Sequence, residues 1–209
     1  MRLTAHAEWS PGYSFSATDL RDTLWIFGHR DGNSYSPNGR SWRKDTLGAA
    51  NASAHNAYVV LGGAIYAIGG AESQTRPTRK AVWKSTDGRH WQLLTDHPAW
   101  SARVWHTAVV HDSRIWLIGG FDGAYRNDIW SSSDGINWQL ATPNAPFFRS
   151  NDVWSSRNGA SWTPRGHANW SPRFSLASTV FRDRVWVLGG KEGGGAFTND
   201  VWFLDTLTR

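Results

Sequence analysis

The chain has 209 residues, enough for one domain with a substantial core but short for two. It contains 15 Trp, one Met and no Cys, which favours an aromatic, β-rich core and excludes disulfides and thiolate metal sites. The net charge of +5 is spread along the chain without a run of like charge, so we expect no nucleic-acid partner.

The N-terminal residues contain no apolar segment of the kind found in signal peptides, and no stretch approaches about 18 consecutive apolar residues. The sequence therefore predicts no membrane partner. A chain without cysteine suits reducing and oxidising compartments equally. A cytoplasmic location and export with the leader removed thus both stay open.

The first half of each predicted unit is marked by a pair of aromatic residues. The pairs Trp9 and Trp25, Trp100 and Trp116, and Trp170 and Trp186 are each separated by 16 residues, and Ala50 and Tyr66 repeat that spacing. Each pair brackets a β-like run, a polar turn and an apolar strand. The apolar strand then runs into glycine: Gly28, Gly69-Gly70, Gly119-Gly120 or Gly189-Gly190.

The second half of each unit begins, after a variable loop, with a strand that has a central aromatic residue: Tyr35, Trp83, Trp130, Trp154 or Trp202. Four of these five strands run into Asn-Gly or Asp-Gly, and Trp follows three residues after that glycine. Asp-Gly between two strand-like runs is a strong hairpin signal, because both turn positions take positive φ. We therefore expect a tight two-residue turn that joins antiparallel third and fourth strands.

The units repeat every 47 to 50 residues, counted from Trp91 to Trp138 and from Gly69 to Gly119. A four-stranded unit of this length cannot bury both faces alone and must pack on copies of itself. The pattern resembles the kelch repeat, specifically the tryptophan-rich bacterial kind with an S-x-D-G-x-x-W hairpin, which is similar to repeats of the galactose-oxidase central domain. The resemblance spans essentially the whole chain. It implies an all-β, kelch-like β-propeller of four-stranded antiparallel blades in a single domain, residues 1–209.

Two irregularities interrupt the repeat. The N-terminal segment aligns with a fourth strand, whereas the last repeat ends after its third, so we expect residues 2–8 to pair with residues 201–204 and complete the last blade. After Phe147, two strands and a glycine pair are missing, which leaves a half repeat at 148–168. The prediction is therefore about four complete blades plus a half repeat that opens more readily than the others.

Candidate functional side chains lie where the repeats differ, because shared positions are explained by packing. Fourteen of the 15 tryptophans fall on repeat positions, and Trp105 is the exception. The loops between second and third strands vary most, and in a propeller they would surround one mouth of the central channel. The candidate ligand-binding residues at this mouth are Arg103, Trp105, His106, Tyr125, Arg126, Asp122, His29, Arg30, Arg173 and Glu192.

Two functions fit these residues. The primary prediction is non-catalytic binding of a glycan, peptide or protein at the channel mouth. Loops that carry both positive and negative charges around aromatic side chains suit all three ligands. The alternative is a carbohydrate-active enzyme of sialidase or sialic-acid mutarotase type. Such an enzyme would grip a substrate carboxylate with Arg103, Arg126 and Arg173, and use Glu192 or Asp122 for proton transfer.

A competing structural interpretation applies to the arginines. Arg103 and Arg173 occupy equivalent repeat positions, so each could instead stabilise its blade through a bond to a carbonyl. No cofactor is expected. The lack of Cys excludes the copper and Tyr-Cys cofactor of galactose oxidase, and the eight His show no metal-ligand spacing.

Overall fold

The computed structural model describes residues 16–27, 32–45, 56–71, 79–145, 152–158, 161–167, 169, 173–174, 177–181, 184–192 and 197–204. Only the backbone is described at 152–154 and 167 and from residue 173 onward. These residues form an all-β, repeat-like arrangement of antiparallel sheets in two compact units, Met1–Asn144 and Ala145–Arg209. No helix in the described part of the chain is long and apolar enough to cross a membrane. The single domain over 1–209 stays a prediction.

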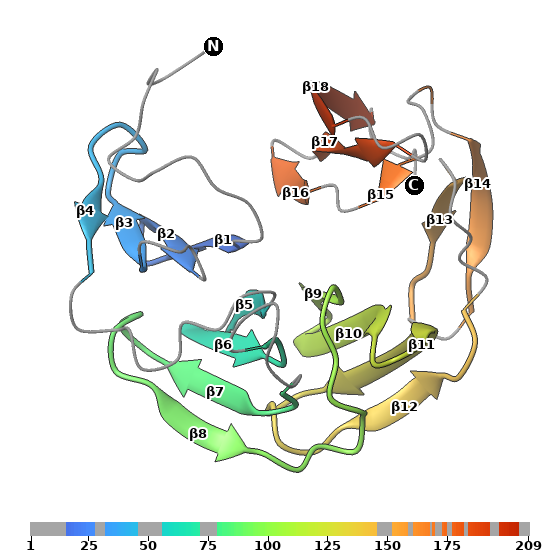
Figure 1. Ribbon diagram of the computed structural model, residues 1–209, viewed down its shortest axis with the longest axis horizontal. Coiled ribbons are helices and arrows are strands. Elements are labelled where there is room, and N and C mark those ends of the chain that lie inside the picture. The colour runs from blue at the N-terminus through green and yellow to red at the C-terminus, as the bar shows by residue number, and fades with distance from the viewer. Residues whose placement is uncertain are drawn as a thin grey trace. The chain divides into compact units, whose positions relative to one another are not determined.

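The first unit contains three four-stranded antiparallel sheets with one topology (Figure 1). The first sheet is β1 (Ser16–Leu20), β2 (Thr23–Phe27), β3 (Ser34–Ser36) and β4 (Arg43–Lys44). The second is β5 (Ala57–Leu61), β6 (Ala64–Ile68), β7 (Val82–Ser85) and β8 (Gln92–Thr95). The third is β9 (Thr107–His111), β10 (Arg114–Phe121), β11 (Tyr125–Ser132) and β12 (Gln139–Thr142). Each strand pairs with its neighbour in sequence, so the four-stranded unit predicted from the repeat is confirmed here.

The second unit contains a two-stranded sheet and a larger one. The two-stranded sheet is β13 (Asp152–Ser155) and β14 (Thr163–His167). In the described part of the chain this sheet has two strands, which agrees with the strand pair expected at 148–168. In the larger sheet, β17 (Arg184–Glu192) pairs with β15 (Arg173–Phe174), β16 (Ala177–Phe181) and β18 (Phe197–Leu204). The strand expected at residues 2–8 lies outside the described residues.

The first two strands of each sheet in the first unit are joined by tight two-residue turns. Both residues have positive φ at Arg21-Asp22 (51° and 58°), Gly62-Gly63 (58° and 73°) and Asp112-Ser113 (49° and 54°). This is the turn geometry that matches the right-handed twist of paired strands. Two of the three turns achieve it without glycine.

The Asp-Gly segments, by contrast, are not the tight turns that the sequence predicts. The loop between β7 and β8 is six residues long, and in its Asp-Gly pair only Gly88 has positive φ, at 79°. The Asp87 carboxylate accepts hydrogen bonds from the backbone N–H groups of Arg89 and His90, both at 2.8 Å. Ser85 Oγ accepts one from Gly88 N at 2.8 Å. The strands do pair antiparallel as expected, but side chains close the turn.

A tryptophan completes each of these hairpins in the first unit. The indole Nε1 of Trp42, Trp91 and Trp138 donates to the carbonyl of the hairpin glycine at 3.3, 3.2 and 3.0 Å. The hairpins at Asn38 and Asp134 repeat the side-chain contacts of Asp87. The S-x-D/N-G-x-x-W motif is therefore a closed local network of hydrogen bonds.

Neighbouring sheets of the first unit pack through the same glycines. A Cβ atom at Gly88 would lie 2.7 Å from the Trp25 ring on β2, and one at Gly135 would lie 2.8 Å from the Tyr66 ring on β6. Each of these two hairpins therefore packs against the second strand of the preceding sheet. Apolar clusters form beside these contacts, one between the first and second sheets and one between the second and third.

A substitution of Gly88 tests this contact. Gly88→Ala should lower the free energy of unfolding by about 1 to 2 kcal/mol from its left-handed backbone and by about 1 to 3 kcal/mol more from the clash with Trp25. Gly62→Ala is the matched control, because Gly62 also has positive φ (58°) but no atom within 4 Å of the added Cβ. Urea unfolding of both variants measures the difference. Equal losses would show that the Trp25 contact is not restrictive.

Candidate functional site

The segment 103–106, directly before β9, is held by hydrogen bonds on both sides. Val104 and Phe121 form an isolated antiparallel bridge, with N to O distances of 3.0 and 2.8 Å. The carbonyl of Arg103 accepts a bond from Gly70 N at 3.2 Å. Between these anchors Trp105 adopts a left-handed backbone with φ of 59°. For a residue with a bulky side chain this costs about 1 to 2 kcal/mol.

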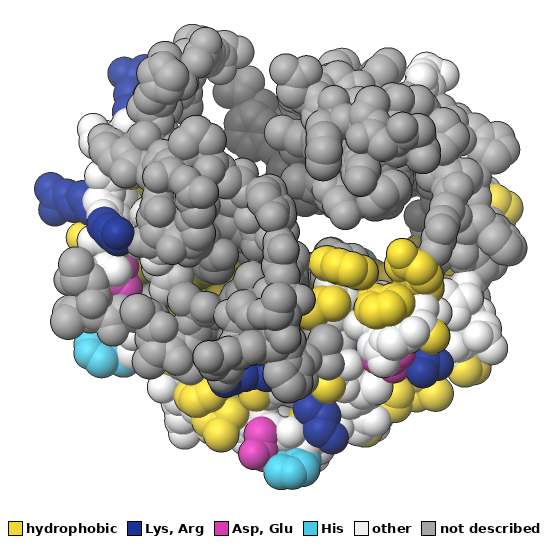
Figure 2. Space-filling model, in the orientation of Figure 1, with side chains coloured by type: hydrophobic (Ala, Val, Ile, Leu, Met, Phe, Trp, Pro, Cys, Tyr) yellow, Lys and Arg dark blue, Asp and Glu magenta, His cyan; other side chains and the backbone are white. Residues whose placement is uncertain are grey.

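Three aromatic side chains meet next to the turn that joins β10 and β11. The Trp105 and Phe121 ring centroids are 5.4 Å apart, with planes inclined by 37°. Phe121 and Tyr125 meet edge to face at 5.2 Å. Trp105 is 58% exposed and Tyr125 is 68% exposed, whereas Phe121 between them is half-buried. We call these three residues the aromatic platform, and Figure 2 shows hydrophobic side chains gathered near β9 and β10.

The register of the hairpin places the charged candidates on its other face. Phe121 pairs with Tyr125 across the ladder, and Gly120 pairs with Arg126. Because successive side chains of a strand point to opposite faces, Arg126 points away from the platform. The sequence grouped Tyr125 and Arg126 as one surface, but the structure separates them.

An ion pair occupies this charged face. Arg126 Nε lies 2.9 Å from both carboxylate oxygens of Asp122, and Ser101 Oγ donates to the same carboxylate. The hydrogen bonds from Arg126 and then Ser101 lower the pKa of Asp122 to about 2. Asp122 is therefore ionised at neutral pH. The Arg126 side chain is 49% exposed and that of Asp122 is 6% exposed, so solvent reaches the pair from the arginine side.

Arg103 lies inside the structure and uses its nitrogens there. Its guanidinium donates to both oxygens of Asp128 at 2.6 and 3.0 Å, and to the Gly119 carbonyl at 2.9 Å. Further bonds reach the carbonyl and hydroxyl of Ser101 at 3.2 and 3.0 Å. The residue is only 1% exposed. This geometry corresponds to the stabilising role that the sequence left as the competing interpretation.

His106 is also buried, between two sheets. Its Nε2 lies 3.0 Å from the Ile68 carbonyl, so the ring donates there. A Cβ at Gly69 would lie 2.7 Å from His106 Cε1, and one at Gly120 would lie 2.9 Å from its Cβ. The glycine pairs therefore make room for this ring. Burial lowers the pKa of His106 to about 4, with a further lowering from Arg103, so the ring is neutral at pH 7.

The remaining candidates are placed only in part. His29 and Arg30 lie outside the described residues. Arg173 and Glu192 are opposite each other in the β15–β17 ladder of the second unit, and their side chains are not described. The structure thus brings Trp105 and Tyr125 together on one face, and joins Asp122 to Arg126 on the other.

Two participants were missed by sequence reasoning. Phe121 directly follows a glycine pair, where other copies have Ala71 or Lys191, and this difference is the signal that could have found it. Asp128 has counterparts in Asp152 and Asp200, because all three precede a strand aromatic in an Asn-Asp pair. A search for positions where the repeats differ therefore does not find it.

Comparison of the chain with protein-family models found no match, and no curated protein matches it either. Within the described ranges, no group of three or more His, Asp or Glu side chains could hold a metal ion. The interpretation of the site therefore rests on the geometry of the residues themselves.

The buried His106 predicts a pH-dependent stability. A histidine with a folded pKa near 4 and an unfolded pKa near 6.5 takes up a proton on unfolding between those values, so stability falls as the pH is lowered. From pH 7 to 4.5, His106 should reduce the free energy of unfolding by about 2 kcal/mol. Urea unfolding at the two pH values measures this loss.

His106→Gln is the control, since glutamine can donate to the Ile68 carbonyl and does not titrate. Its loss between pH 7 and 4.5 should be smaller than that of the parent by about the same 2 kcal/mol. The pKa values of Asp122 and Asp134 are about 2, so these groups act mainly below this window. An identical pH dependence in parent and variant would contradict the assignment.

Proposed function

We propose that this chain is a kelch-like β-propeller that acts as a non-catalytic binding module through its aromatic platform, Trp105, Phe121 and Tyr125. The observation that carries the proposal is Trp105, a large apolar side chain that is 58% exposed on a left-handed backbone. Strained residues persist only where their surroundings impose the conformation, and they cluster at ligand sites. Here the strain is imposed on the one tryptophan that the repeat does not require.

The propeller part of the proposal is supported by the first unit. Its three sheets share one up-and-down order. The first strands are neighbours, because β1 contacts β5 and β5 contacts β9. Innermost strands that adjoin one another in this way are the arrangement of blades around a channel. The contacts of Gly88 with Trp25 and of Gly135 with Tyr66 repeat between successive sheets.

The chemistry of the platform suits stacking. The two outer rings of the platform, Trp105 and Tyr125, are exposed. Exposed aromatic rings can cover the apolar face of a sugar or hold a hydrophobic side chain of a peptide or partner protein. The Arg126–Asp122 pair lies on the opposite face of the hairpin. The ligand should therefore be held mainly by its apolar surface, and we expect a glycan, peptide or protein.

The enzyme alternative, of sialidase or sialic-acid mutarotase type, is less well supported. It requires Arg103 to grip a substrate carboxylate, but this guanidinium is buried against Asp128. It also requires a proton donor. Of the two candidate donors, Asp122 has a pKa of about 2 and carries no proton to donate at neutral pH, and the side chain of Glu192 is not described.

Substitution of the platform tests the proposal. A glycan and peptide screen first identifies a ligand of the parent, and calorimetry then measures its affinity for Trp105→Ala and Tyr125→Ala. The dissociation constant of each variant should be roughly tenfold or more higher than that of the parent, which is the loss typical of a central aromatic contact. Leu140→Ala is the matched control, because Leu140 is an exposed apolar residue (47%) on β12 of the same sheet. It should bind like the parent.

Trp105→Gly separates binding from packing. Glycine removes the ring and also relieves the left-handed strain, so this variant should be at least as stable as the parent while losing the ligand. A variant that is strongly destabilised would show that Trp105 is a packing residue. Unchanged ligand affinity in a folded Trp105→Gly protein would place the binding surface elsewhere.

A further inference from the structure

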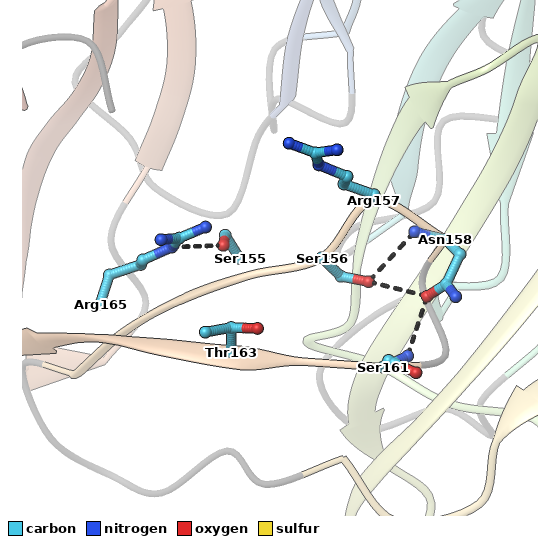
Figure 3. Close-up of a pocket in the computed structure, with 7 residues that line it drawn as sticks. All are labelled: Ser155, Ser156, Arg157, Asn158, Ser161, Thr163 and Arg165. Carbon is cyan, nitrogen blue, oxygen red and sulfur yellow. Dashed lines mark hydrogen bonds between the residues drawn. The ribbon is translucent and has the colours of Figure 1, made fainter. Parts of the chain in front are cut away.

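A second candidate site lies in the second unit, on the β13–β14 hairpin. It is a cavity of about 220 Å³, and Figure 3 shows its lining side chains, which come from the two strands and their connecting loop. Every lining residue is polar, two are arginines, and none is acidic: Ser155, Ser156, Arg157, Asn158, Ser161, Thr163 and Arg165. The cavity therefore presents an excess of hydrogen-bond donors and positive charge.

The two arginines lack a carboxylate partner in the described part of the chain. Arg165 Nε donates to Ser155 Oγ at 2.7 Å, which fixes the side chain without neutralising it. Arg157 makes no hydrogen bond or ion pair there. In Figure 3 the two guanidinium groups lie on opposite sides of Ser155. This contrasts with Arg103 and Arg126, each of which is paired with an aspartate.

The turn of this hairpin lacks the acidic residue found in two of its three repeat counterparts. The turn residue is Asn158, matching Asn38 in the first hairpin, where the other two have Asp87 and Asp134. Asn158 still accepts bonds from Ser156 Oγ at 3.3 Å and Ser161 N at 2.9 Å, so it fulfils the turn role without a negative charge.

Both arginines are also additions to the shared motif. In the other hairpins, the residue equivalent to Arg157 is Pro, Thr or Ser, and the residue equivalent to Arg165 is Asp, Leu or Ala. Neither side chain is therefore explained by the fold that all copies share. The cavity thus combines an uncharged turn residue with two arginines that no other hairpin has at these positions.

We propose that this cavity binds a tetrahedral oxyanion, phosphate or sulfate, either as the free ion or as the monoester of a small polar molecule. Arginine forks match the oxygens of such groups, and serine and threonine hydroxyls supply further donors. The site is separate from the aromatic platform and does not depend on it.

Calorimetric titration with inorganic phosphate at constant ionic strength tests the proposal. The parent should bind, whereas Arg165→Gln and Arg157→Gln should each bind roughly tenfold or more weakly, because each loses one charged donor. Arg40→Gln is the matched control. Arg40 is an exposed arginine on the β3–β4 hairpin, which also has an asparagine at the turn, Asn38. It removes the same charge elsewhere and should leave phosphate binding unchanged.

Asn158→Asp provides a second test that preserves the fold, because Asp87 and Asp134 close the same turn. It should weaken phosphate binding to a similar degree at an unchanged melting temperature. Tighter binding of a hexose 6-phosphate than of inorganic phosphate, with no binding of the hexose, would identify a monoester ligand, and equal binding would identify the free ion. The proposal is overturned if the parent binds neither ligand at millimolar concentration, or if Arg40→Gln loses as much affinity as Arg165→Gln.

Discussion

The contact between a hairpin glycine and an aromatic ring of the preceding sheet holds the first unit together. Gly88 on Trp25 and Gly135 on Tyr66 leave no space for a Cβ atom. The glycines can approach so closely because serine, aspartate and tryptophan side chains hold the hairpin in one shape. The repeated motif is therefore a single device that closes a turn and joins two sheets.

The regular part of the fold could be predicted from the sequence because its spacing is periodic. Four-stranded units and the β13–β14 half unit follow from that spacing. The turn geometry could not, since Asp-Gly is shared by two-residue turns and by longer loops whose side chains cap the backbone. Ser85 and Trp91, at fixed offsets from Gly88, are the signs of the longer loop.

The candidate site was predictable only where it departs from the repeat. Trp105 was identified because no other copy has tryptophan there, and its side chain is 58% exposed. The burial of Arg103 and His106 depends on Asp128 and on Gly69, which are distant in sequence. No local pattern contains that information. The Ser101 hydroxyl donates to Asp122 and accepts a hydrogen bond from Arg103, so one side chain links the Arg126–Asp122 and Arg103–Asp128 ion pairs.

The hairpin contacts of the first unit also bear on how such a chain changes over evolutionary time. Each one joins a sheet to the sheet immediately before it. An insertion or deletion of one whole four-stranded unit keeps both partners of each remaining contact between a hairpin glycine and an aromatic ring. An insertion or deletion of any other length removes one of the two partners. The β13–β14 pair, which keeps turn hydrogen bonds of Ser156, Asn158 and Ser161 and has two strands in the described part of the chain, has the form expected of a step that stopped within a unit.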